Sequence, residues 1–224
     1  MLLDDALRQR RSIRAFRSDP PSLDLVRDLL EAARRSPSGT NIQPWKVHVV
    51  AGAARDRLVS EVLAHRETNP HDQGSEFPRT GGQRRDPYLT RMRTLGKTMY
   101  GLLQIPKGDQ AANWRQWGRN YEFFDAPVGL IFTIDRDLDA MSFLDIGIFM
   151  QSFMLAAASR GLGTCAQGAW NNYWSVTRRV LNIPETELIV AGMSLGWPDE
   201  TAPVNSLQAE REPVDSFAVF HGFS

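Results

Sequence analysis

The sequence predicts a layered fold that combines helices with a small sheet, of the α/β or α+β class. Short apolar or alternating runs, typical of strands, are separated by longer segments with helical periodicity. About four such runs stand among a larger number of helical segments. The segment at residues 142–160 is apolar nearly all round, so it needs neighbours on every side. It lies either inside a large domain or partly against a second subunit.

The strand and helix expectations follow the chain in order. Residues 2–10 have an apolar helical face, and residues 22–35 form a helix that begins after the N-cap Ser22 and ends before Pro37. Strands are expected at residues 45–51, 128–134 and 188–195, with a further strand followed by a turn within 161–170. The remaining helices are expected at residues 53–66, 88–104, 109–122, 142–160 and 172–182.

Length and composition indicate a globular protein of ordinary make-up. The chain has 224 residues, of which 42% are hydrophobic and 23% charged. Its 26 basic residues balance 26 acidic ones, which argues against a nucleic-acid partner, because such binding needs a strong positive field. A single cysteine excludes an internal disulfide and fits a reducing compartment. Neutral net charge gives little protection against association and favours an oligomer.

Two segments bear on location. The first residues lack the apolar core of a signal peptide. Residues 142–160 are shorter than the ~20 apolar residues of a membrane span, and they include Asp145 and Gln151. We therefore expect a buried helix, no membrane partner and a cytoplasmic protein.

Several common active sites are excluded by their missing motifs. The four histidines are scattered, which argues against a zinc hydrolase. Neither a GxSxG elbow nor a phosphate-binding P-loop occurs. The glycines Gly161, Gly163 and Gly168 follow a helix with the wrong spacing for a dinucleotide-binding loop.

A basic cluster near the N-terminus is the first positive signal. In an extended segment, Arg10, Ser12 and Arg14 point to one side, with Arg11 between them. Two guanidinium groups and a hydroxyl on one side suit a phosphate or carboxylate. The alternative is a solvated basic face paired with nearby aspartates.

Two further segments could meet a ligand. The loop at residues 36–45 is rich in amides and hydroxyls and lies between a helix and a strand, although such a loop can also satisfy its own backbone. The run GLGTCAQGAW at residues 161–170 offers small residues that allow close approach to the backbone. Its Cys165 is expected to be a buried structural thiol rather than a nucleophile.

Together these segments resemble the nitroreductase family of flavin enzymes. The resemblance rests on four motifs in the family's order, which span nearly the whole chain: RRSIRAF, SPSGTNIQPWKVHVV, GLGTCAQGAW and AGMSLGWPDETAPVNSLQAEREPV. It implies an α+β fold with a central, mostly antiparallel sheet flanked by helices, in an intertwined homodimer. Residues 1–224 would form a single domain, with an excursion at about residues 67–123 covering the active site.

The resemblance also implies a site for non-covalently bound FMN at the dimer interface. Arg10, Arg11 and Ser12 would hold phosphate or ribityl groups, and Arg14 would lie near the N1/O2 edge of the flavin ring, where a cation stabilises developing negative charge. Pro37, Ser38, Gly39 and Asn41 would come from the second subunit. The backbone of Ala166, Gln167 and Gly168 would meet flavin N5, and Arg211 would reach the phosphate. Relatives often have serine at the position of Gly39, and some have a second basic residue at that of Ala209.

The implied chemistry is hydride transfer from NADPH or NADH through flavin N5 to a small-molecule acceptor, such as a nitroaromatic or a quinone, with ping-pong kinetics. No side chain is expected to act as an acid, base or nucleophile. The excursion carries many aromatic and basic side chains that could contact an acceptor, its carboxylate or the NADPH 2′-phosphate: Tyr88, Tyr100, Trp114, Trp117, Tyr121, Phe123, Phe124, Arg79, Arg84, Arg85, Arg91, Arg93 and Lys97. Alternatives are a reductive dehalogenase of the iodotyrosine type and a flavin-storage protein with little turnover.

Overall fold

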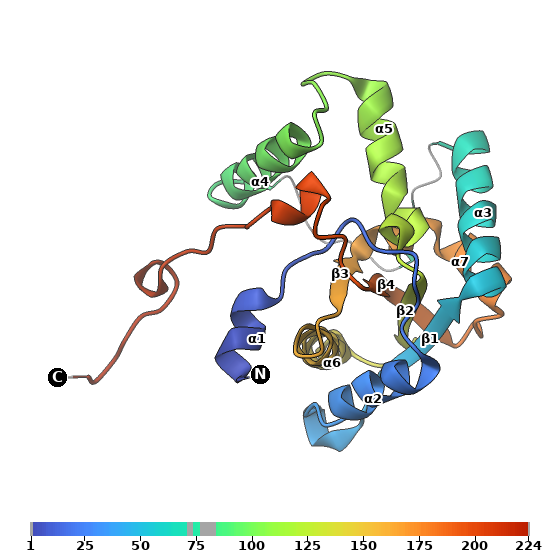
Figure 1. Ribbon diagram of the computed structural model, residues 1–224. Coiled ribbons are helices and arrows are strands. Elements are labelled where there is room, and N and C mark those ends of the chain that lie inside the picture. Colours follow the sequence, from blue (N-terminus) through green and yellow to red (C-terminus); the bar gives the residue numbers. More distant parts are fainter. Residues whose placement is uncertain (1, 71–73, 77–83, 224) are drawn as a thin grey trace.

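The fold is built on one antiparallel sheet with helices on both faces (Figure 1). The computed structural model describes residues 2–70, 74–76 and 84–223. The strands β1 (Lys46–Ala51), β2 (Val128–Asp135), β3 (Gly163–Gln167) and β4 (Glu187–Gly196) pair in the order β1-β2-β4-β3. Every pairing is antiparallel, which settles the fold class as α+β. The predicted strands are confirmed.

The central strands β2 and β4 are buried because helices cover both faces of the sheet. Along β2, Leu130 and Phe132 face one apolar cluster and Ile131 faces the other, as the alternation of side chains requires. The helices α2 (Leu23–Ala33) and α6 (Met141–Ala158) pack together on the first face, and α3 (Gly52–Thr68) and α7 (Trp174–Leu181) on the second (Figure 1).

The helix predicted at residues 109–122 is too long. The α-helix α5 (Gln110–Gly118) stops early, and Arg119–Asp125 form a 3₁₀ segment, η2, in which Phe123 has φ 54°. This left-handed backbone turns the Phe123 ring into the core, where it stacks on Trp170 at 4.4 Å between centroids. A β-carbon on Gly129 would lie 2.4 Å from the Phe123 ring, so the strand needs glycine there.

Two apolar parts of the chain are only partly covered within one copy. The helix α6 is long and apolar enough to span a membrane by length and composition alone, yet Met141 and Leu144 lie exposed on its surface while its other face packs on α2. The C-terminal tail leaves the body of the protein (Figure 1), and Phe217 and Phe223 are 71% and 83% exposed. Both elements therefore present apolar surface that a single copy does not bury.

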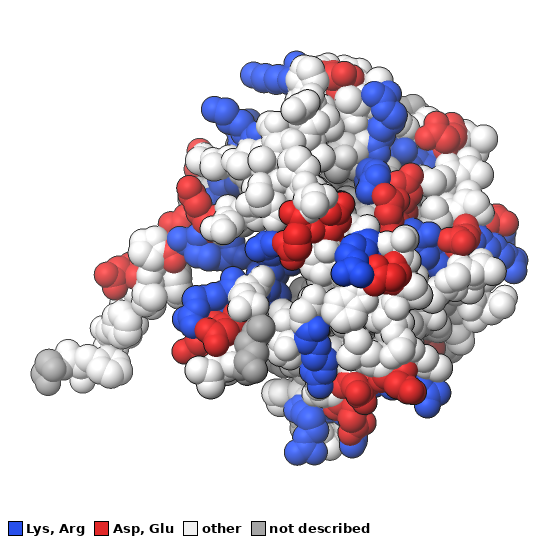
Figure 2. Space-filling view, viewed as in Figure 1, with Lys and Arg blue, Asp and Glu red and all other residues white. Residues whose placement is uncertain are grey.

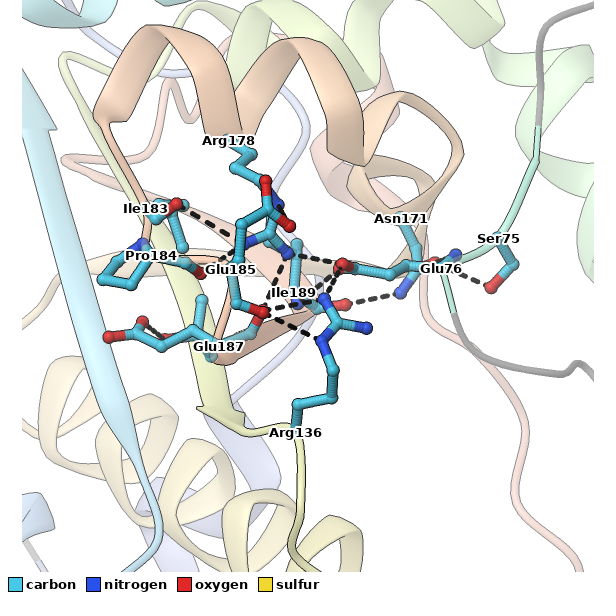
Figure 3. Close-up of polar contacts among 11 residues, drawn as sticks. Ser75, Glu76, Arg136, Asn171, Arg178, Ile183, Pro184, Glu185, Glu187 and Ile189 are labelled. Carbon is cyan, nitrogen blue, oxygen red and sulfur yellow. Dashed lines mark hydrogen bonds and ion pairs between the residues drawn. The ribbon is translucent and has the colours of Figure 1, made fainter.

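A buried carboxylate joins the excursion to the start of β4 (Figure 3). Glu76, whose side chain is 3% exposed, accepts from the guanidinium groups of Arg136 and Arg178. Its second oxygen accepts from the Ile189 N–H at 3.0 Å. The Glu76 N–H donates to Asn171 Oδ1 at 3.1 Å, so the excursion is fixed to the segment that follows β3.

Candidate active site

The arginine segment runs along the free edge of the sheet. Ser12 forms a parallel β-bridge with Thr164, and the Ile13 N–H donates to the Thr164 carbonyl at 2.9 Å. Because β3 is an edge strand, this bridge places the segment where no further strand follows among the described residues. The Arg14 N–H donates to Asn205 Oδ1 at 2.8 Å, which fixes the segment at a second point.

The basic side chains of this segment meet Arg211 at one hollow. The hollow has a volume of about 760 Å³. The structure thus brings together residues that stand nearly 200 positions apart: Arg10, Arg11, Ser12, Arg14, Leu207, Gln208, Ala209 and Arg211 all line the hollow. Figure 2 shows basic side chains gathered where the C-terminal tail leaves the body.

These cations have few anionic partners. Within the described part of the chain, no carboxylate pairs with Arg10, Arg14 or Arg211, and the side chains of Arg14 and Arg211 donate to backbone carbonyls. Burial, and after it the charge of Arg211, lower the pKa of Arg10 below its usual value. Like charges held together without a counter-charge favour binding of an anion, and guanidinium forks suit a phosphate.

Arg11 differs from its neighbours because it has an acidic partner. Its Nη2 donates to Glu200 Oε2 at 3.3 Å, while its Nε is buried without a hydrogen-bond partner among the described residues. Cys165 lies beneath the same cluster, and burial raises the pKa of its thiol despite the nearby charge of Arg14. The thiol therefore stays protonated near neutral pH, as expected for a structural cysteine.

Two further hollows extend from Arg14 toward the end of β3. Arg14 also lines a hollow of about 150 Å³ together with Tyr100, Trp117 and Asn120. Trp117 and Asn120 in turn line a hollow of about 420 Å³ whose wall includes the stretch from Ala166 to Gly168. Each hollow shares a lining residue with the next, so the three are neighbours: the first lies at Arg10, Arg14 and Arg211, and the last lies at the end of β3.

Backbone groups at the end of β3 lie in the wall of the third hollow. Backbone groups of a strand alternate between its two edges, so Ala166 turns its N–H and carbonyl toward the same outer edge as Thr164. Ala166 and Gly168 are exposed, whereas Gln167 is buried. The Gln167 Nε2 donates to the Asn120 carbonyl at 2.7 Å and its Oε1 accepts from Ser194, which fixes this stretch.

One predicted segment of the site lines none of these hollows. It is the loop with Pro37, Ser38, Gly39 and Asn41. It is held against α6 by the Gly39 N–H, which donates to Asp145 Oδ1 at 3.1 Å. Within it, Thr40 and Asn41 have φ values of 46° and 62°. A left-handed β-branched residue is costly, and such strain is typical of loops that contact a ligand.

The excursion's candidate side chains divide into separate groups. Tyr121, Phe123 and Phe124 are core residues, and the Trp114 ring lies 3.4 Å from the Arg66 guanidinium carbon. Arg91 pairs with Glu212 on the tail. Tyr100, Trp117 and Arg84 line the hollows, while Arg79 lies outside the described residues.

Two polar residues of the site were not predicted from the sequence. Asn205 bonds the Arg14 N–H and donates to the carbonyls of Ala15 and Asp199 at 2.8 and 2.9 Å, so it fixes the arginine segment. Asn120 lines two of the hollows. The one signal for Asn205 was an amide directly after the apolar residues Ala202, Pro203 and Val204.

Comparison with known proteins finds relatives that match nearly the whole chain. The profile described as "Nitroreductase family" matches residues 7–197. The chain is 41% identical over 221 residues to the 4-nitrobenzoate reductase of Pseudomonas putida, covering 98% of this chain and 96% of that protein. It is 39% identical over 218 residues to the nitrobenzene nitroreductase of Ectopseudomonas oleovorans, covering 97% and 96%.

A solved structure shares the whole fold. The FMN and NADPH-dependent nitroreductase NfnB from sphigopyxis sp. strain HMH superposes with a TM-score of 0.96, at 31% identity and with 100% of both chains covered.

Proposed function

The chain belongs to the nitroreductase family, and from this membership we propose that it is an FMN-dependent oxidoreductase that uses NAD(P)H to reduce nitroaromatic or quinone-like acceptors. One observation of the structure carries the proposal furthest. Arg10, Arg14 and Arg211 line one hollow and have no carboxylate partner among the described residues. Two neighbouring hollows, each sharing a lining residue with the one before, reach the end of β3.

The residues that line these three hollows fit FMN. The guanidinium groups of Arg10 and Arg211, which pair with no carboxylate of the described residues, suit its terminal phosphate. The Nε of Arg11, buried without a hydrogen-bond partner among the same residues, lies close by. Ser12 would bond the phosphate or the ribityl chain. Arg14 would meet the pyrimidine edge of the ring, and the backbone from Ala166 to Gly168 would meet the ring edge that carries N5.

When bound, FMN supplies the redox chemistry by taking hydride from NAD(P)H and passing it to the acceptor. The protein's own residues bind and orient. A nitro group reduced in this way gains two electrons and two protons and loses one oxygen as water, giving a nitroso group. Arg14 would hold a positive charge where the bound ring becomes more negative. Protons come from solvent, so we assign no acid or base to a side chain.

We propose that the working unit is a homodimer in the cytoplasm. The exposed face of α6 and the exposed aromatic tail would both be buried by a second copy. The partner's loop, with Pro37, Ser38, Gly39 and Asn41, would complete each site, which accounts for a strained loop that lines no hollow of its own chain. The excursion at about residues 67–123 would cover the same site within a single domain.

The test is the spectrum of the purified protein followed by rapid mixing. We expect a yellow protein whose flavin absorbance bleaches on anaerobic mixing with NADPH and returns when a nitroarene is added. A colourless protein that ignores added FMN would refute the proposal. Bound flavin that NADPH does not bleach would instead indicate a flavin-storage protein.

A further inference from the structure

A charged side chain stands at the hollow beside the end of β3. This hollow, of about 420 Å³, is lined by Trp117, Asn120 and the stretch from Ala166 to Gly168. Arg84 lines it as well, and it is the only charged residue among the described residues that do so. The other polar side chains among the described lining residues are mainly amides, so Arg84 is the one charge of this described lining.

Few of the N–H donors of the Arg84 guanidinium group have a partner among the described residues. Within the described chain, its Nη1 donates to the Met92 sulfur at 2.9 Å. A thioether is a weak acceptor, and a guanidinium group has five N–H donors. No carboxylate of the described residues pairs with Arg84, in contrast to Arg91, which pairs with Glu212 at 2.7 Å. Arg84 can therefore receive a carboxylate from a ligand.

The same hollow has a flat apolar surface. Trp117 stands in the last turn of α5 with 44% of its surface exposed, and it lines the hollow together with Arg84. An indole face stacks on an aromatic ring. The described lining thus offers an aromatic surface and one cation without a carboxylate partner, which matches a ligand that has a ring and one negative charge.

We propose that this hollow is the acceptor subsite and that Arg84 selects nitroaromatic acceptors that bear a carboxylate over neutral ones. The inference rests on the proposed function. The acceptor's ring lies against Trp117, its carboxylate meets Arg84, and its nitro group points toward the stretch from Ala166 to Gly168. Arg84 thus sets specificity and takes no part in the chemistry.

The NADPH 2′-phosphate is the competing ligand for this cation. It lies at the adenosine end of the dinucleotide, remote from the ring that gives up hydride, whereas Arg84 shares one hollow with Gly168. A group that meets Arg84 while its reacting end lies near Gly168 must belong to a small molecule. The geometry therefore favours the acceptor's carboxylate.

The test compares 4-nitrobenzoate with nitrobenzene, which differ by the carboxylate alone. We expect Arg84→Gln to lower kcat/KM for 4-nitrobenzoate roughly tenfold and to leave kcat/KM for nitrobenzene within about twofold, as removal of one charge-assisted hydrogen bond implies. Titration of the FMN-loaded, oxidised protein with 4-nitrobenzoate, followed by flavin absorbance without NADPH, should show a matching rise in Kd. Arg84→Lys should recover part of the affinity.

Arg85→Gln is the matched control, because Arg85 is an exposed neighbour that lines no hollow. It should leave both acceptors unchanged. Equal effects of Arg84→Gln on both acceptors, or none, would overturn the inference while the enzyme still reduces nitroarenes. A rise confined to the KM for NADPH would assign Arg84 to the 2′-phosphate and overturn it too. Failure to reduce either acceptor would instead count against the proposed function.

Discussion

Ser12 and Thr164 form a parallel β-bridge, and this pairing places the basic N-terminal segment against the edge strand of the sheet. Residues that stand about 150 positions apart thereby share one wall of the site. The bridge leaves Arg10 and Arg14 free to face the hollow where Arg211 also lies. The backbone pairing thus positions these guanidinium groups, and no carboxylate of the described residues pairs with Arg10, Arg14 or Arg211.

The first prediction concerns this cluster. The double variant Arg10→Ala, Arg14→Ala should purify without yellow colour, because removing each charge-assisted hydrogen bond weakens FMN binding by roughly tenfold or more. The Arg14 N–H that bonds Asn205 is a backbone group and survives the change. The measurement is the ratio of FMN to protein by absorbance.

Arg17→Ala is the control for this experiment. Arg17 lies in the same segment but pairs with Asp19 at 2.8 Å and lines none of the hollows. It should keep full flavin content. Full occupancy in the double variant would show that the cluster does not hold the cofactor.

The second prediction separates stacking from charge at the acceptor subsite. Trp117→Ala should raise KM for 4-nitrobenzoate and nitrobenzene by a similar factor, roughly five- to tenfold, because the ring is common to both. Steady-state kinetics at saturating NADPH would measure it, with flavin content as the check on folding. An effect confined to the carboxylated acceptor would contradict the assignment of the indole to the ring.

The third prediction concerns Glu187, the first residue of β4. Burial alone would raise the pKa of its carboxyl, but hydrogen bonds from Thr133 and His48 and the charge of Lys46 together hold that pKa below its usual value. The oxygens of Glu187 lie 2.6 Å from Thr133 Oγ1 and 3.4 Å from Lys46 Nζ. A lowered pKa stabilises the fold above the unfolded-state pKa, and the benefit is lost as pH falls through the folded-state pKa.

Glu187→Gln should therefore unfold more easily by about 1–2 kcal/mol at neutral pH and lose less stability than the parent protein below about pH 4.5. Urea unfolding at several pH values would test it. Parallel curves for the two proteins across the acid range would show that this carboxylate contributes nothing to acid unfolding.

The fourth prediction concerns the anchor of the excursion. Glu76→Ala removes the buried carboxylate partner of Arg178 and leaves the exposed Glu185 at 3.9 Å, so it should cost about 3–5 kcal/mol of unfolding free energy. Adding Arg178→Met removes the buried charge that has lost its close partner and should restore part of the stability. Urea midpoints of the three proteins would measure it. If the double variant is no more stable than the single one, the ion pair is not the reason for the destabilisation.

The sequence predicted the strands well because each one is a short apolar run bounded by turn residues. Periodicity alone left the α/β and α+β classes open, because the partners of a strand come from distant parts of the chain. The family motifs supplied the antiparallel sheet. The end of α5 was missed since Phe123 adopts a left-handed backbone that only the packing of its ring on Trp170 explains.

Some residues of the site could be predicted from the sequence, and others depend on contacts that only the fold creates. The basic cluster could be predicted from alternation in an extended segment, and Arg211 came only from the resemblance. Among the excursion's cations the sequence offered no ranking, because pairing is a tertiary property: Arg91 meets Glu212, while Arg84 stays unpaired within the described chain. Asn205 was missed because its role is to bond backbone groups that lie far from it in sequence.

The last prediction concerns the C-terminal tail. Deleting residues 214–224 removes Phe217, Phe220 and Phe223, all of them exposed in one copy of the chain. If the tail packs on a second copy, deletion weakens the dimer without unfolding the subunit, because burial of each large aromatic contributes roughly 1.5–3 kcal/mol. Sedimentation at several concentrations should show a dimer for the full chain and partial dissociation for the shortened one. Dissociation would also remove the partner's loop from each flavin site, so flavin content should fall in parallel. A shortened chain that stays fully dimeric and yellow would mean that the tail's aromatic side chains do not hold the subunits together.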